Sequence, residues 1–176
     1  MKLLKIIALF LLLFSINTAL FGQSKSEQIK AIRQEFTNIN NTTTLKKVKL
    51  ENEEFLGSMT DGGGILTGYY ETGIIRKIHQ WVGLSNGIEI KEYYFQNGSL
   101  IFVYEKFNAF VYDSKKEQFD QSKTERTFEG RYYFNNQKLI DYVTTGHNRF
   151  EDDSIDPEKT LLKEANDYFN LLNKKK

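Results

Sequence analysis

Few side chains in this sequence form a pattern that is typical of catalysis, metal binding or phosphate binding. Histidine occurs only twice, at His79 and His147, and cysteine is absent. Two histidines without ligand spacing do not predict a zinc site, and a chain without cysteine has no thiol nucleophile. Asp61 and the glycine run at residues 62–64 precede a predicted strand, whereas a phosphate-binding loop follows a strand and opens a helix. We therefore expect a flexible loop here, and neither a cofactor nor a metal.

Four carboxylates, Glu151, Asp152, Asp153 and Asp156, precede a predicted helix. Such groups are ligands for calcium, but the spacing and central glycine of an EF-hand are missing. Negative charge at a helix start is favourable by itself, and we prefer this interpretation. Other carboxylates could form a hydrolase pair, yet the sequence does not show which of them face each other across a cleft. We therefore predict no catalytic residues.

A set of tyrosine and charged side chains is the best candidate for a binding surface. Pairing across a two-residue turn at residues 97–98 places Phe95, Tyr93 and Phe102 on one side of a sheet, which we assign to the core. The candidate ligand-binding residues on the other side are Tyr94, Tyr133, Tyr142, Glu92 and Arg131. Rigid aromatics among charges are typical of recognition surfaces. An ordinary solvent-exposed face, whose tyrosines serve cross-strand pairing, explains the same residues.

The strands that must position these residues lie between Gly64 and Thr145. Runs of β-branched and aromatic residues alternate there with turn residues, at 72–73, 85–87, 97–98 and 136–137. Asn-Gly between apolar runs is a strong hairpin signal, and connections this short cannot make parallel crossovers. The sequence therefore predicts an antiparallel β-meander of about six or seven strands.

Two amphipathic helices are predicted to flank the meander. Ser24 and Glu27 fit a capping box for a helix over residues 24–40, and Asp156 fits the N-cap of a helix over residues 157–173. We therefore predict an α+β fold in which the N-terminal and C-terminal helices both pack on one face of the sheet.

The N-terminus has the pattern of a secretory signal. Two lysines precede an apolar stretch over residues 6–14, and small residues follow near Gly22. Spanning a bilayer needs roughly 20 apolar residues, so an uncleaved membrane anchor is the less favoured alternative. We predict a signal peptide at residues 1–22, a single domain at 23–176 with no transmembrane span after cleavage, and a periplasmic or secreted location.

Composition narrows the class of partner. The chain has 24 basic and 23 acidic residues, and a nucleic-acid-binding protein would carry a strong positive stripe. We therefore expect no nucleic-acid partner. Because cysteine is absent, the fold must be stabilised by burial rather than by disulfides.

A hairpin motif is repeated at residues 68–75, 92–100 and 131–139, each time with two tyrosines before a tight turn. The Tyr-Tyr-x-x-Gly pattern faintly resembles MORN-type repeats, whose hairpins stack into a sheet. The chain more closely resembles small uncharacterised secreted bacterial proteins with Tyr-Tyr-Phe-x-Asn-Gly-x-Leu hairpins before a closing helix. This resemblance implies fold and location, and no function.

The sequence therefore favours an exported, non-enzymatic module that binds an envelope protein, peptide or glycan through the tyrosine-bearing face. Two alternatives stay open: an envelope hydrolase with carboxylates that the sequence does not pair, and an envelope structural protein that self-associates through sheet edges.

Overall fold

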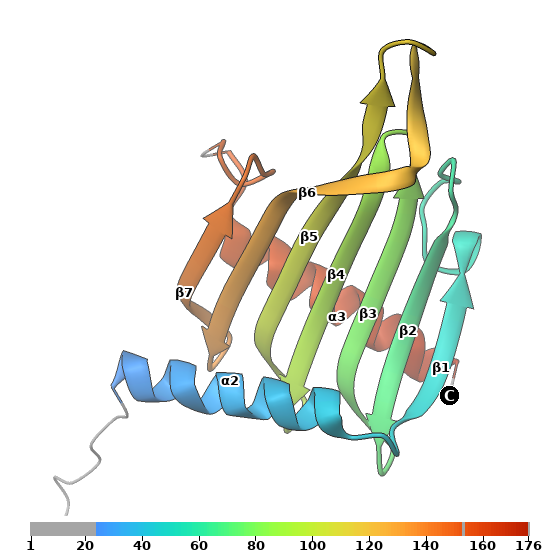
Figure 1. Ribbon diagram of the computed structural model, residues 1–176. Helices are drawn as coiled ribbons and strands as arrows, with labels where there is room; N and C mark the ends of the chain where they lie inside the picture. Colours follow the sequence, from blue (N-terminus) through green and yellow to red (C-terminus); the bar gives the residue numbers. More distant parts are fainter. Residues whose placement is uncertain (1–23, 153, 176) are drawn as a thin grey trace, which may run out of the picture.

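The computed structural model describes residues 24–152 and 154–175. The predicted signal peptide at residues 1–22 and Asp153 lie outside these ranges. The described chain forms one seven-stranded antiparallel sheet whose strand order follows the sequence (Figure 1). This arrangement confirms the predicted meander. The strands are β1 (Lys46–Glu51), β2 (Gly64–Glu71), β3 (Ile74–Leu84), β4 (Gly87–Gln96), β5 (Ser99–Asp113), β6 (Gln118–Asn135) and β7 (Lys138–Thr145).

Tight turns fix the hairpins. Asn97 and Gly98, with φ of 51° and 77°, connect β4 to β5, and two successive positive φ angles are typical of a type I′ turn. Asn136 and Gln137, with φ of 49° and 60°, make an equivalent connection between β6 and β7 without a glycine. The predicted turns at both positions are therefore confirmed.

Both predicted helices are present, as α2 (Lys25–Asn41) and α3 (Pro157–Lys174). A short 3-10 helix (Asn52–Glu54) follows β1. The Ser24 hydroxyl accepts a hydrogen bond from the Glu27 N–H, while the Glu27 carboxylate accepts one from the Ser24 N–H. This pair is the predicted capping box at the start of α2. No helix in the described part of the chain is long and apolar enough to cross a membrane.

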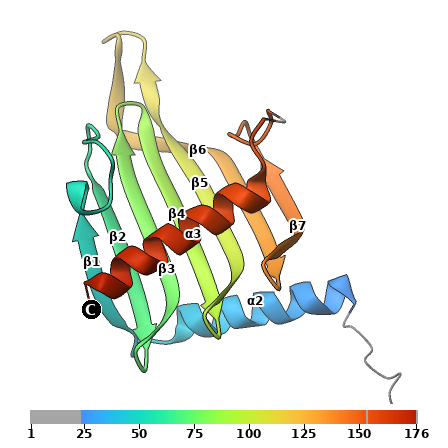
Figure 2. The same cartoon turned by 180° about the vertical axis from the view of Figure 1, so that it is seen from behind.

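The prediction that both helices pack on one face of the sheet is wrong. They lie on opposite faces, with α2 in front of the sheet in Figure 1 and α3 in front when the view is turned by 180° in Figure 2. The α3 helix packs on Tyr93 and Tyr132, whereas α2 packs on Tyr94 and Tyr133. Successive strand residues point to opposite faces. Each tyrosine doublet therefore gives an apolar ring to both faces, and each face needs a helix to cover it.

A β-bulge also changes the predicted register of β4 and β5. The bulge lies between Tyr94 and Phe95, so that Tyr93 is opposite Val103 and Tyr94 is opposite Phe102. A one-residue shift moves every following side chain to the other face. Phe102 therefore lies on the α2 side, and its predicted placement on the same side as Tyr93 is wrong.

Candidate binding surface on the α2 side of the sheet

The five residues predicted to bind a ligand do not share one open face, and this part of the prediction is wrong. Tyr94 and Tyr133 are 0% and 2% exposed beneath α2. Tyr142 is 56% exposed, but it pairs with Tyr132 and stacks on that ring on the α3 side, with 6.1 Å between centroids. Glu92 and Arg131 are on the α2 side of the sheet. A ligand-binding role for these last two residues stays a prediction.

Tyr94 attaches the C-terminal part of α2 to the sheet. Its hydroxyl donates to the Glu92 carboxylate at 2.7 Å and accepts from the Asn40 side-chain amide at 3.1 Å. The Phe36 ring lies 4.9 Å from the Tyr94 ring. Burial raises the pKa of the Tyr94 hydroxyl, and the adjacent Glu92 carboxylate raises it further. Tyr94 is therefore a neutral hydrogen-bonding member of the core.

Glu92 is held in its charged form. Burial by itself disfavours the carboxylate, but the Lys77 ammonium, 2.7 Å from it, lowers the pKa of Glu92 below its usual range. Lys77 also donates to the Asn40 side-chain oxygen at 3.0 Å. The charge of Glu92 is therefore already compensated inside the protein.

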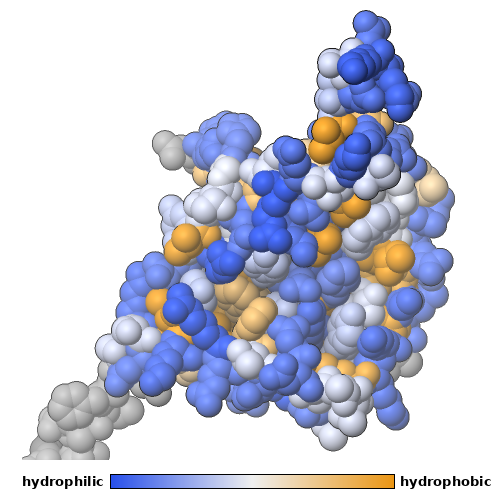
Figure 3. All heavy atoms as spheres, in the orientation of Figure 1, coloured by the Kyte–Doolittle hydropathy of each residue, from blue (hydrophilic) through white to orange (hydrophobic). Residues whose placement is uncertain are grey.

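A row of side chains crosses the open half of this face, next to the row that α2 covers. These residues are cross-strand partners on successive strands, and we call them the middle row: Lys49, Thr67, His79, Glu92, Tyr104, Arg131 and Val143. In Figure 1, α2 crosses only the lower part of the sheet and leaves the part above it uncovered. Figure 3 shows this face as a mixture of hydrophilic and hydrophobic side chains. The middle row therefore lies in the part of the α2 side that the helix leaves uncovered. Its exposed members are Lys49, Arg131 and Val143, whereas Thr67 is buried.

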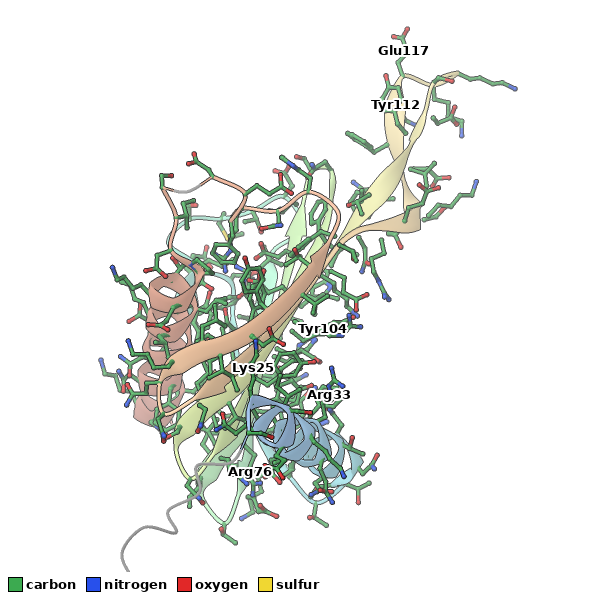
Figure 4. The ribbon with its side chains drawn as sticks, turned by 90° about the vertical axis from the view of Figure 1, so that its left-hand side faces the viewer. Lys25, Arg33, Arg76, Tyr104, Tyr112 and Glu117 are labelled. Carbon is green, nitrogen blue, oxygen red and sulfur yellow. The ribbon has the colours of Figure 1, made fainter. Side chains whose placement is uncertain are left out.

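A groove of about 560 Å³ runs between α2 and the sheet beside the middle row. Its lining combines apolar side chains with two arginines: Ile32, Arg33, Phe36, Phe102, Tyr104, Arg131, Tyr133 and Val143. Figure 4 shows Arg33 and Tyr104 on the same side of the sheet. The sequence prediction missed both residues. Tyr104 reaches this side because of the bulge, and Arg33 does so because α2 docks here.

Aromatic rings hold several of the cations. The Arg131 guanidinium lies 5.6 Å from the centre of the Tyr104 ring, and the Lys106 ammonium lies 5.9 Å from it. The Arg33 guanidinium lies 5.5 Å from the Tyr133 ring, and its Nε donates to the Tyr133 hydroxyl at 3.3 Å. These contacts fix the positions of the charges without neutralising them.

Arg131 differs from the other cations because it has a carboxylate partner. Glu129 pairs with both Arg131 and Arg126. In contrast, no ion pair joins Arg33, Lys49 or Lys106 to a carboxylate of the described residues. The surface therefore retains uncompensated positive charge.

Other candidate groups identified from the sequence have local structural roles. The Asp156 carboxylate accepts from the Lys159 N–H at 3.2 Å, and the Asp152 carboxylate accepts from the Ser154 N–H at 2.9 Å. Asp156 is the N-cap of α3, which confirms the helix-start interpretation for this residue. Within residues 24–152 and 154–175, no three His, Asp or Glu side chains are grouped so that they could hold a metal ion.

Comparisons with models of protein families, with curated proteins and with solved structures each found no match. The role of the α2 side must therefore be inferred from its geometry and charge.

Proposed function

We propose that this protein is an exported, non-enzymatic module that binds an acidic peptide segment on the α2 side of the sheet. The segment would lie across the middle row and extend into the groove beside α2. The observation that carries this proposal is the imbalance of charge around an apolar groove. Arg33, Lys49 and Lys106 have no ion pair with a carboxylate among the described residues, whereas Asp141, Glu92 and Glu129 on this face already have cationic partners.

The pairing of the carboxylates explains why the ligand should be anionic. Glu92 pairs with Lys77, and Asp141 pairs with Lys25 at 2.8 Å. Glu129 has two arginine partners. An acidic ligand would therefore meet free cations without displacing internal pairs, whereas a basic ligand would have to compete for each carboxylate.

The shape of the surface favours an elongated ligand with apolar side chains. Neighbouring strands are about 4.8 Å apart, so the distance from β3 to β6 along the middle row is about 15 Å. An extended chain of about five residues covers this distance. The groove floor offers Phe102 and Tyr133, and Phe36 and Ile32 line its α2 side. Apolar residues between the acidic ones would bury area against these rings.

The proposed export depends on the signal pattern at residues 1–22. An acidic segment of an envelope protein is the type of partner that a protein in that location would meet. A binding role rather than a catalytic one is supported by the internal pairing of Glu92, because a carboxylate committed to a lysine and a tyrosine is a poor proton carrier.

Selection from a displayed library of random peptides of about eight residues tests this function. We expect the selected peptides to be enriched in Asp and Glu. Arg33→Gln should weaken binding of a selected peptide about tenfold, because one charge-assisted hydrogen bond is lost. Lys163→Gln removes one positive charge from an exposed position on α3 and is the matched control that should change nothing. Selection without acidic enrichment, or equal binding by Arg33→Gln and the wild type, would contradict the proposal.

A further inference from the structure

The two edges of the sheet differ in the side chains that they expose. Among the described residues β7 is the last strand at its edge, as Figures 1 and 2 show. The strand at the other edge, β1, has only six residues, and three of them are lysines. In contrast, β7 carries two large apolar side chains that are exposed, Tyr142 at 56% and Val143 at 51%. An exposed apolar edge strand is a template for pairing with another strand.

The β6–β7 ladder determines which backbone groups of β7 face outward. The Leu139 N–H points away from β6, because it donates to the Glu158 carboxylate of α3 at 2.8 Å. The next residue, Ile140, is an extra residue in the ladder and forms a β-bulge. Every second residue of an antiparallel strand points its backbone groups outward, and a bulge shifts this alternation by one residue. Tyr142 and Thr144 therefore present N–H and C=O groups on the outer side, where no described residue bonds to them.

Open hollows border this end of β7 on both faces. On the α3 side, a hollow of about 550 Å³ is lined by Tyr142, Thr144, Phe150 and the exposed Ile155, among others. On the α2 side, the first turns of α2 extend past β7 in both Figure 1 and Figure 2. A hollow of about 660 Å³ follows these turns and is lined by α2 residues alone, including Ile29. A helix that reaches beyond the last strand leaves space beside it for one more strand.

We propose that this end of β7 is the interface of a two-fold homodimer, in which the β7 strands of two copies pair antiparallel. A two-fold axis at Val143 places this residue opposite itself on the α2 side. Tyr142 then lies opposite Thr144 of the second copy, so that the outward backbone groups of both residues are paired. The two Tyr142 rings become diagonal neighbours on the α3 side, within reach of each other. The exposed apolar side chains of the edge are thus gathered around the axis.

Charge and symmetry favour a second copy as the partner. In this register Asp141 lies opposite Thr145 of the second copy, and Lys138 lies beyond the paired segment. No charged side chain of β7 therefore faces its own copy, which would be destabilising. A two-fold contact uses the same edge of both copies. Because the other edge is the lysine-bearing β1, the assembly closes at two copies.

Side-chain contacts must add to the backbone pairing, because a stable interface buries about 1,600 Å² in total. The part of α2 that extends past β7 would cover the added strand on one face. Phe150 and Ile155 would contact it on the other face. The strands that carry the rest of the middle row lie away from this edge, so the dimer is independent of the proposed acidic peptide.

A single introduced cysteine tests the register, because the chain has no cysteine of its own. Directly opposite residues without hydrogen bonds between them have Cα atoms about 4.5 Å apart, which is within the range of a disulfide. Val143→Cys should therefore form a covalent dimer under mild oxidation. Ile74→Cys is the matched control, since Ile74 is also 51% exposed but lies at the start of β3. We expect Val143→Cys to cross-link at least about tenfold faster, because the dimer holds its two thiols together.

Sedimentation velocity of the purified protein at about 5–500 μM measures the assembly directly. We expect a dimer that dissociates on dilution. Tyr142→Lys places two like charges beside the axis and should weaken the dimer about tenfold or more, whereas Ile74→Lys should not. Circular dichroism checks that each variant is folded, and the cysteine pair decides the matter if Tyr142→Lys is not.

The proposal is overturned if the wild type is monomeric at the highest concentration or forms assemblies larger than a dimer. It is also overturned if Val143→Cys cross-links no faster than Ile74→Cys, or if folded Tyr142→Lys dimerises like the wild type. No peptide is present in these measurements, so failure of the acidic-peptide proposal would not affect them.

Discussion

The two tyrosines of a doublet have equivalent roles on opposite sides of the sheet. The Tyr93 hydroxyl donates to Glu164 on the α3 side, and the Tyr94 hydroxyl donates to Glu92 on the α2 side. In both cases a buried ring supplies apolar area while its hydroxyl reaches a carboxylate. Tyrosine therefore suits both positions, because phenylalanine would leave each carboxylate without this donor.

His79 makes stability depend on pH. Burial lowers the pKa of the His79 imidazole below 6.5, although Glu92 opposes this effect, and Lys77 and Lys106 lower the pKa further. As pH falls through 6.5, the unfolded state takes up a proton that the native state resists. The contribution of His79 to the free energy of unfolding should therefore fall as the solution becomes more acidic.

Urea unfolding at about pH 7.5 and pH 5.5 measures this effect. We expect His79→Gln to lose less stability than the wild type between the two pH values. The control is His147→Gln, which replaces the exposed histidine of the loop after β7. In this variant His79 should still cause the same loss of stability between the two pH values as in the wild type. Equal losses in the wild type and in His79→Gln would show that burial does not control this imidazole.

At the scale of elements, the turn between β4 and β5 can be tested by a matched pair of glycines. Gly98 has φ of 77°, and a Cβ added to it would meet no atom within 4 Å. A substitution there is therefore opposed only by the strain of the positive φ. Gly57 also has open space, but without a positive φ. Gly98→Val should lower the free energy of unfolding by about 1 kcal/mol or more, whereas Gly57→Val should have a much smaller effect. Thermal melts of the two variants provide the comparison, and similar losses would exclude strain at the turn as the cause.

The helices and strands could be predicted from local residue patterns. The face of the sheet on which each side chain and each helix lies could not. The Asn-Gly turn and the Ser24 capping box depend on neighbours within a few residues. The bulge at Tyr94 and Phe95 has no comparable local signal, yet it decides which side Phe102 and Tyr104 occupy. The amphipathic pattern of a helix likewise predicts that the helix packs on the sheet. It does not predict on which face, because both faces of this sheet carry apolar rings. The groove beside α2 could therefore not be predicted before the position of α2 was known.

The whole molecule is a three-layer arrangement of α2, the sheet and α3. The edge strand β1 is only six residues long and carries Lys46, Lys47 and Lys49. Short, lysine-bearing edge strands discourage pairing with another chain. This feature argues against self-association through the β1 edge, which was one of the alternative functions that the sequence left open.

Because both apolar clusters are built on the same strands, we expect the domain to unfold as one unit. Leu161 of α3 is fully buried against the sheet, whereas its neighbour Leu162 is only partly buried. Leu161→Ala should lower the free energy of unfolding by about 2–5 kcal/mol, and Leu162→Ala should lower it less.

Trp81, the single tryptophan, shares the α2 side with His79. Its fluorescence therefore reports on the face opposite the mutation. In Leu161→Ala, melting followed by Trp81 fluorescence and by far-UV circular dichroism should shift to the same lower temperature. A Trp81 transition that stays at the wild-type temperature while the dichroism signal is lost would show that the two faces unfold independently.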